Sequence, residues 1–163
     1  MMRLLRHLFA PSARTLFPAA CLKEITDAIV AAERNHRGEI CFAVEASLPA
    51  RAVLAGVDSA TRARQVFGEL GVWDTEHNSG VLVYLLLADH HIEIVADRGY
   101  RGRVTDAQWR EACDTIAAGL RENQPKAGVL RAVEMISAHM ERHFPRREGE
   151  HDEDELPNRP HFL

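Results

Sequence analysis

Apolar residues recur at helical spacing in four segments of the chain. Between residues 18 and 36, Leu22, Ile25, Ile29 and Ala32 fall on one face of a helix. The same spacing predicts a helix over 58–70, one that starts at Thr105 and includes Leu120, and one over 125–143. Asp58 or Ser59 would cap the second helix, and Thr105 with Gln108 forms a capping-box pattern at the start of the third.

Three shorter apolar segments have the length and composition of strands, namely Glu39–Ala46, Gly80–Ala88 and His91–Ala96. The second and third are joined only by Asp89-His90, so they should form an antiparallel hairpin. The first and second are joined through the helix over 58–70, which predicts a right-handed parallel crossover. The order is therefore α-β-α-β-β-α-α, and we expect an α/β fold, an α/β/α sandwich with a small mixed sheet. The connection from Ser47 to Val57 is expected to be a loop.

Length and charge divide the chain into one domain with two flanking segments. The 163 residues, 46% of them hydrophobic, are enough for a single compact domain. Residues 1–18 carry three arginines and no acid, residues 19–145 form the mildly acidic body, and residues 146–163 carry six acids against three arginines. This acidic tail, with its run Glu148–Glu155 and two later prolines, is expected to be extended. Its apolar end, residues 156–163, would suit docking onto the body or onto a partner.

These properties exclude several classes of protein. A net charge of −4 with a mildly acidic body is unlike a reader of the phosphate backbone, so no nucleic acid is expected as a partner. No apolar run approaches the roughly 20 residues that span a bilayer, and the N-terminal segment lacks the apolar core of a signal peptide. We therefore expect a cytoplasmic protein whose residues 1–18 either pack on the body or touch a membrane surface. Cys21, Cys41 and Cys113 have no metal or redox spacing and are expected to be reduced thiols of the core.

The predicted topology brings polar residues together at one edge of the sheet. The two parallel strands begin where the antiparallel strand ends, so the loops at 36–39, 73–80 and 97–106 should meet there. Ten candidate site residues lie in these loops: His36, Glu39, Asp74, Glu76, His77, Asn78, Asp97, Arg98, Arg101 and Asp106. No other part of the chain concentrates such chemistry.

Within this set, Asp74, Glu76, Asp97 and Asp106 are candidate ligands of a divalent cation. Carboxylates drawn from several loops suit Ca²⁺ or Mg²⁺, while participation of His36 or His77 would shift the preference toward Mn²⁺ or Zn²⁺. The same residue types also serve as turn and capping residues in most proteins, and no known metal-binding spacing is present.

The loop Asp97–Val104 is a candidate anion site. Arg98 and Arg101 precede a helix N-terminus, which suits phosphate, and next to a metal this would be phosphoryl chemistry. The alternative is a solvated basic turn. No nucleophile elbow and no cysteine–base motif are present, so catalytic residues stay unassigned.

Six short motifs resemble those of the TPM domain family over residues 19–145. They are His36-Arg37-Gly38-Glu39-Ile40, Phe67-x-x-Leu70, Asn78-Ser79-Gly80-Val81-Leu82, Asp89, Asp97-Arg98-Gly99 and Thr105-Asp106-Ala107. The resemblance implies an α/β/α sandwich that binds a divalent cation, often calcium, in an acidic cleft. Some plant members are described as acid phosphatases, and others look like accessory proteins of membrane complexes. Many bacterial members have a signal peptide and a membrane helix and lie near LemA-type membrane proteins; this sequence has neither segment, so it looks like a soluble, stand-alone branch.

Three functional hypotheses follow. The first is a cation-binding accessory module that serves a membrane-associated complex, with a membrane protein, a LemA-type protein or a second TPM protein as partner. The alternative is a metal-assisted acid phosphatase acting on phosphomonoesters. The third is an interaction protein that binds its partner through the acidic tail.

Overall fold

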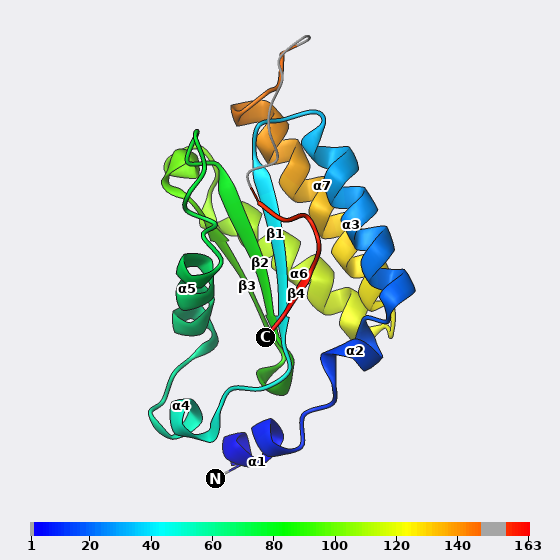
Figure 1. Cartoon of the computed structure of the whole chain (residues 1–163), viewed down its shortest axis with the longest axis vertical. Helices are drawn as coiled ribbons and strands as arrows, with labels where there is room; N and C mark the ends of the chain where they lie inside the picture. The colour runs from blue at the N-terminus through cyan, green and yellow to red at the C-terminus, as the bar shows by residue number, and fades with distance from the viewer. Residues whose placement is uncertain (1, 148–155) are drawn as a thin grey trace.

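The computed structural model describes residues 2–147 and 156–163 and is built around a four-stranded mixed sheet (Figure 1). Its strands are β1 (Glu39–Glu45), β2 (Gly80–Leu86), β3 (His91–Ala96) and β4 (His161–Phe162), in the spatial order β3-β2-β1-β4. β1 runs parallel to β2 and to β4, and β2 runs antiparallel to β3. The predicted parallel pairing of β1 with β2 and the predicted hairpin of β2 and β3 are both confirmed.

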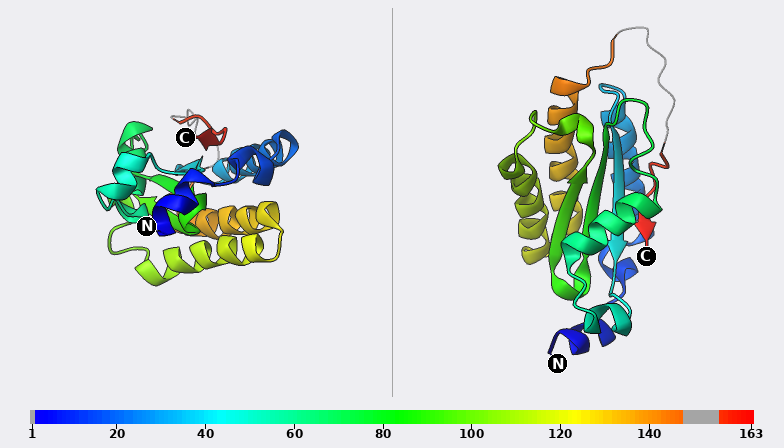
Figure 2. Two further views of the ribbon diagram at one scale, coloured as in Figure 1. Left: turned by 90° about the horizontal axis from the view of Figure 1, so that it is seen from below. Right: turned by 90° about the vertical axis from the view of Figure 1, so that its left-hand side faces the viewer.

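Helices cover both faces of this sheet (Figures 1 and 2). One face packs against α3 (Ala19–Glu33), α6 (Asp106–Arg121) and α7 (Pro125–His143), and the other packs against α5 (Ser59–Glu69). Three shorter helices lie toward the end of the sheet where β1 and β2 finish: α1 (Met2–Leu8), α2 (Ala13–Leu16) and α4 (Ala50–Leu54). The short turns η1 (Leu87–Asp89) and η2 (Arg98–Tyr100) precede and follow β3.

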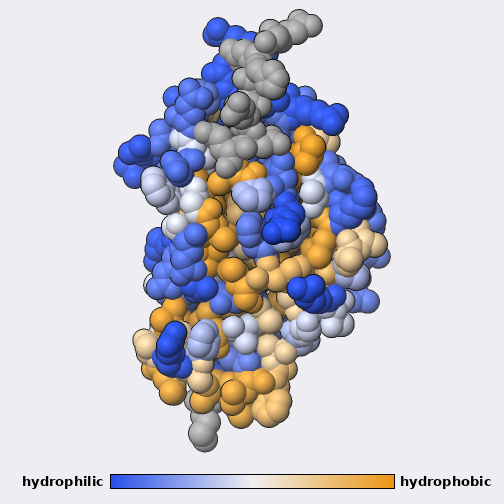
Figure 3. Space-filling model, viewed as in Figure 1, coloured by the Kyte–Doolittle hydropathy of each residue, from blue (hydrophilic) through white to orange (hydrophobic). Residues whose placement is uncertain are grey.

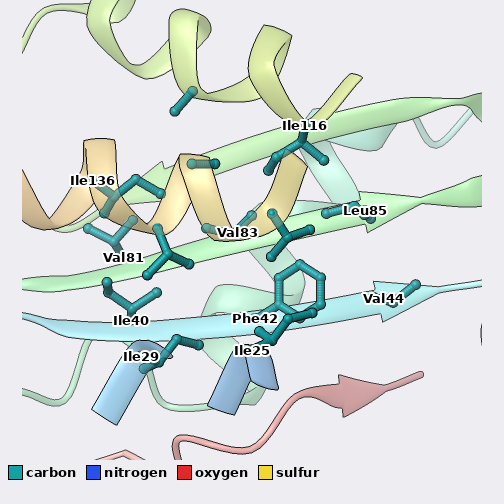
Figure 4. Close-up of a cluster of buried hydrophobic side chains, with 14 of the residues drawn as sticks. Ile25, Ile29, Ile40, Phe42, Val44, Val81, Val83, Leu85, Ile116 and Ile136 are labelled. Carbon is teal, nitrogen blue, oxygen red and sulfur yellow. The ribbon is translucent and has the colours of Figure 1, made fainter. Parts of the chain in front are cut away.

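The two central strands are buried along their whole length because each face meets a separate core. Alternate residues of β1 and β2 point to the α3, α6 and α7 side, where Phe42 and Val83 pack with Ile25 and Ile136 (Figure 4). The intervening residues, such as Leu82 and Tyr84, pack toward α5. Three layers with a core on each face confirm the predicted α/β/α sandwich.

The helix caps agree with the sequence pattern. The Asp58 carboxylate accepts a hydrogen bond from the Thr61 amide at 2.7 Å, and Thr105 with Gln108 forms the complete capping box. The expected loop over 47–57 is wrong in part, since it contains α4. Pro49 stands at the N-cap of that helix with extended geometry, and the short helix is held by contact with α1.

The segments that flank the predicted domain both lie against it. Residues of the N-terminal segment form α1 and α2, and β4 adds a fourth strand through the pairs Ala43–His161 and Val44–Phe162. The acidic run 148–155 lies outside the described residues. Within the described part of the chain, none of the helices has both the length and the apolarity needed to cross a bilayer.

Candidate functional site

Three loops meet where β1 and β2 begin and β3 ends, the upper end of the sheet in Figure 1. We call this the loop end, and it comprises residues 36–39, 73–80 and 97–106. Ser79 joins all three loops: its hydroxyl donates to the Arg37 carbonyl at 2.9 Å, and its own carbonyl accepts from the Tyr100 hydroxyl at 2.9 Å. Its amide donates to the Thr75 hydroxyl at 3.0 Å. The sequence topology therefore identified a real meeting point of loops.

Asn78 fixes the position of the arginine loop. It adopts a left-handed conformation with φ of 52°, which asparagine tolerates better than most residues. Its side-chain Oδ1 accepts from Arg98 Nε at 2.7 Å, and its carbonyl accepts from the Gly99 amide at 3.0 Å. A Cβ at Gly99 would clash with the Asn78 carbonyl and with the Phe144 ring, so the close approach requires glycine at this position.

Asp97 caps the turn η2, and its two carboxylate oxygens lie in different environments. Its Oδ1 accepts from the Arg98 amide at 2.6 Å, and its own amide donates to the Gly80 carbonyl at 2.9 Å. Its Oδ2 is buried and has no hydrogen-bond partner among the residues that the structure describes. A buried carboxylate oxygen without a partner is energetically costly, which makes Asp97 the most informative residue of the loop end.

Four of the predicted site residues line one surface hollow of about 380 Å³. They are Asp97, Arg98, Arg101 and Asp106, and the hollow is completed by Arg64 from α5 and by Tyr100 and Trp109. A second hollow of about 700 Å³ continues along β3 and shares Arg64, Ile94, Asp106 and Trp109 with the first. Two carboxylates and three arginines therefore surround a space that a small anion or a hydrated cation would fit.

The other predicted residues lie outside this hollow. Asp74 and Glu76 are exposed on the loop before β2, and Glu76 lies 3.9 Å from the half-buried His77. His36 and Glu39 are buried at the start of β1, where His36 Nδ1 accepts from the Gly38 amide at 3.2 Å. Across residues 2–147 and 156–163, no three His, Cys, Asp or Glu side chains form a group able to hold a metal ion. The structure thus does not gather the four predicted carboxylates into one ligand set.

Tyr100 is a buried residue among those that line the hollow. It is 2% exposed, and its ring packs edge-to-face against Trp109 and Phe144, with centroids 5.5 and 5.0 Å away. Burial first, and then the negative charge of Asp97, raise the pKa of its hydroxyl above the usual range. The hydroxyl therefore stays protonated and keeps donating to the Ser79 carbonyl.

The cysteines are poor candidates for nucleophiles, as the sequence indicated. Cys41 is buried, and burial raises the pKa of its thiol to about 12. Cys113 is half-buried, and burial likewise raises the pKa of its thiol to about 11. Because the thiolate is the reactive form, neither side chain is reactive near neutral pH.

Sequence reasoning missed a polar cluster between α5 and β3. The Ser59 hydroxyl lies 2.8 Å from His91 Nδ1 and donates to Glu93 Oε1 at 2.5 Å. The serine stands between the other two groups, whereas a catalytic triad places the histidine in the middle, so this cluster ties α5 to β3 instead. The alternation in β3 puts His91 and Glu93 on one face, but nothing in the sequence pairs them with Ser59.

A second unpredicted cluster surrounds Glu45 at the far end of β1. Glu45 is 4% exposed and accepts from the Tyr84 hydroxyl at 2.6 Å and from Arg62 Nε at 2.8 Å. Burial, followed by the hydrogen bond to Glu45, raises the pKa of Tyr84 above its usual range. This carboxylate is fully engaged, and the cluster is a structural link between the sheet and α5.

Comparisons with known proteins agree with this architecture. A family model described as the TPM domain matches residues 13–139. The solution structure of BA42 from the psychrophilic bacterium Bizionia argentinensis is 29% identical, with a TM-score of 0.77 over 90% of this chain and 95% of that one. The N-terminal domain of cg2496 from Corynebacterium glutamicum is 16% identical, with a TM-score of 0.55 over 75% of this chain and 72% of that one, and shows a likeness of fold alone. No curated protein matches the chain.

Proposed function

The chain belongs to the TPM domain family, and from that premise we propose that it is a binding module that holds a divalent cation with Asp97 and Asp106. The supporting observation is the buried Asp97 Oδ2, which has no hydrogen-bond partner among the described residues and belongs to a side chain that lines the same hollow as Asp106. A cation would compensate this oxygen, whose burial is otherwise unfavourable.

The two carboxylates favour one class of cation. Mg²⁺ commonly binds through one or two carboxylates and keeps several waters, whereas Ca²⁺ takes six to eight oxygens. With Asp74 and Glu76 on the solvent-exposed loop, Mg²⁺ fits the pair at the hollow better than Ca²⁺ does. No imidazole lines this hollow within the described residues. Because Mn²⁺ and Zn²⁺ are expected only with a histidine ligand, the hollow favours them less than Mg²⁺.

An accessory role belongs to the same proposal. The hollow holds two carboxylates and three arginines, with no serine, threonine or cysteine among its lining residues. Such a site is suited to holding a charged ligand rather than to attacking one. Within the family resemblance, the module would then serve a membrane-associated complex, with a LemA-type protein or a second TPM-domain protein as partner.

Thermal melts of the full chain test the cation site. The wild type, Asp97→Asn and Asp106→Asn are melted in EDTA and with Mg²⁺, Ca²⁺, Mn²⁺ or Zn²⁺, since asparagine keeps most capping hydrogen bonds. A cation present at a hundred times its Kd should stabilise the wild type by about 2.7 kcal/mol, and neither variant should show this gain.

Asp74→Asn is the matched control, because it removes an exposed carboxylate from the loop end without touching the hollow. It should keep the full response to the cation. If no metal raises the midpoint of the wild type, or if both hollow variants respond like Asp74→Asn, the proposal is wrong.

One observation supports metal-assisted phosphatase activity as a second candidate: Arg64, Arg98 and Arg101 line the same hollow as the two aspartates. Arginines hold phosphate oxygens, while the cation would polarise the ester. Removing Arg101, as in Arg101→Gln, should lower kcat/KM for p-nitrophenyl phosphate roughly 10- to 100-fold. Arg103→Gln, outside the hollow and stacked on Phe144, should leave turnover unchanged. Activity that survives Asp97→Asn would count against this candidate.

A further inference from the structure

Helix α1 turns Arg3 and His7 toward the body of the protein. The Arg3 guanidinium donates to Asp89 Oδ2 at 2.7 Å and to the Val57 carbonyl at 2.6 Å. His7, one turn later, is 5% exposed; its Nδ1 accepts from the Leu48 amide at 2.9 Å, and its Nε2 lies 3.1 Å from Asp89 Oδ1. Residues three and seven share one face of a helix, so this polar face is held against the body.

The opposite face of α1 and its continuation present large apolar side chains to solvent. Met2, Leu5, Leu8 and Phe9 are 74%, 49%, 61% and 82% exposed, and Leu54 on the contacting helix α4 is 74% exposed. We call these five residues the base patch. They account for five of the seven large hydrophobic side chains that are exposed among the described residues. Hydrophobic residues gather at this lower end of the molecule in Figure 3.

A clustered apolar surface held outward by a specific ion pair indicates a partner. An isolated surface helix would gain by turning its apolar face to the body, as α3 and α5 do. In α1, Leu4 packs against the core, while the contacts of Arg3 and His7 with Asp89 leave Met2, Leu5 and Leu8 exposed. The base patch is therefore a contiguous apolar surface that specific contacts keep exposed, and not a set of unrelated exposed residues.

The charges around the base patch narrow the choice of partner. The first acidic residue of the chain is Glu24, and residues 46–57 contain one charge, that of Arg51. Arg6 on α1 and Arg51 on α4 are exposed beside the apolar side chains. Two carboxylates lie near Arg6: the exposed Asp58 accepts a hydrogen bond from the Thr61 amide, and Asp89 behind the helix is engaged by Arg3 and His7. Apolar side chains flanked by arginines complement an anionic bilayer surface. A second copy of this chain would set the same arginines against each other.

We propose that the base patch is a docking surface for an anionic lipid bilayer, with Phe9, Leu54 and their apolar neighbours entering the interfacial region and Arg6 and Arg51 facing the headgroups. The opposite end of the sheet, with the hollow of Asp97 and Asp106, then points away from the membrane (Figure 1). This inference does not depend on the proposed cation site.

Co-sedimentation of the full chain with vesicles tests the proposal. Vesicles of phosphatidylcholine with phosphatidylglycerol should bind the wild type at low salt, and vesicles of phosphatidylcholine alone should bind it far less. Leu5→Ser with Phe9→Ser should lower the partition coefficient by at least roughly tenfold, because two apolar anchors are lost. Arg6→Gln with Arg51→Gln should lower binding to anionic vesicles and weaken its salt dependence.

Trp73→Ser is the matched control, since Trp73 is 55% exposed and lies at the loop end. It should leave vesicle binding unchanged. In a separate variant, Phe9→Trp should show a blue-shifted emission on adding anionic vesicles, which reports insertion at that residue. Because the substituted side chains are exposed, all these variants should keep the wild-type melting midpoint.

The proposal is overturned if the wild type fails to bind anionic vesicles at low salt, or if the Leu5→Ser, Phe9→Ser variant binds them as well as the wild type does. Equal binding to neutral and anionic vesicles would also overturn it. A concentration-dependent dimer that the same double variant abolishes would assign the base patch to a second copy instead. Loss of the cation response in Asp97→Asn would have no bearing on any of these outcomes.

Discussion

The two ends of the central sheet both hold polar side chains inward, and they differ in the apolar surface that they expose. At the loop end, polar side chains turn inward and bond to backbone groups, as Ser79 does with Arg37 and Tyr100 does with Ser79. At the base, formed by α1, α4 and η1, a carboxylate on the body holds two basic side chains inward while apolar side chains face solvent.

The difference lies in how the contacts are distributed. The loop end is held by several hydrogen bonds between three loops, together with the packing of one aromatic residue. The orientation of α1 depends on Asp89, which is 86 residues away from Arg3. The loop end is thus held by contacts among three loops, whereas the exposed surface of the base depends on a few contacts that Arg3 and His7 make with Asp89, Val57 and Leu48.

Removing Tyr100 should disrupt the loop end most severely. Tyr100→Ala deletes a buried ring that packs on Trp109 and Phe144, so we expect a loss of about 3–5 kcal/mol in the free energy of unfolding. Tyr100→Phe removes only the hydrogen bond to the Ser79 carbonyl and should cost about 0.5–1.5 kcal/mol. Urea denaturation measures both values. Similar losses for the two variants would mean that the hydrogen bond, not the ring, holds the loops.

Removing Asp89 should have the next largest effect and should act at the base. Asp89→Ala leaves the buried His7 and the Arg3 guanidinium without their shared carboxylate, which should cost about 1.5–3 kcal/mol. Urea denaturation at neutral pH gives this value, and faster proteolysis near α1 would locate the change. Asp27→Ala breaks the exposed Lys23–Asp27 pair and should cost only about 0.3–0.5 kcal/mol.

The pH dependence of the same contact has a definite sign. The hydrogen bond from Arg3 is the main cause that lowers the pKa of Asp89, so the folded state holds this proton less tightly than the unfolded state does. The stabilisation is therefore present above the unfolded pKa of about 3.9 and is lost as the pH falls through the lower folded-state value. Asp89→Ala should lack this acid-dependent component. An identical acid response in the wild type and the variant would show that Asp89 does not hold α1.

The main elements could be predicted from the sequence because their periodicity is local. The stripe of Ile25 and Ile29 marks α3, and the short hairpin at Asp89 sets the direction of β3. Strand direction then determines which loops meet, so the position of the loop end follows from the sequence alone. Four residues of the candidate site came together because they follow one another on a single stretch, residues 97–106.

The remainder depends on contacts between distant residues. The apolar positions of α1 suggest a buried face, yet Leu5 and Leu8 are exposed because Arg3 and His7 pair with Asp89, and no local pattern records that pairing. β4 has two residues, too few for any periodicity. Asp74 and Glu76 share a loop with Asn78, yet their side chains face solvent, since a loop sequence does not specify which side chains point toward a neighbouring loop.

Adding a methyl group at Gly99 should destabilise the protein, whereas adding one at Gly68 should not, because only Gly99 is crowded by neighbouring atoms. Gly99→Ala places Cβ against the Asn78 carbonyl and the Phe144 ring, so we expect a loss of about 1–3 kcal/mol. Gly68→Ala in α5 meets no neighbouring atom within 4 Å and should instead stabilise the protein by about 0.5–1 kcal/mol. Thermal melts of the two variants should therefore shift in opposite directions. An unchanged melting midpoint for Gly99→Ala would mean that the loop end can rearrange to accept the methyl group.

The smallest expected effect concerns β4, which borders β1 between the two ends. The ring Nε2 of His161 is buried and has no hydrogen-bond partner among the described residues, and burial lowers the pKa of the ring. The unfolded state then binds a proton more readily than the folded state, so the docking of β4 is favoured above the unfolded pKa of about 6.5 and weakens as the pH falls below it.

The Leu163 amide, which donates to the Val44 carbonyl at 3.1 Å, reports this docking through its hydrogen exchange. After correction for intrinsic exchange, its protection should fall between about pH 7 and pH 5 in the wild type and stay level in His161→Gln. His90→Gln, which replaces an exposed histidine, should keep the wild-type response. If His161→Gln loses protection as the wild type does, a group other than His161 controls the docking of β4.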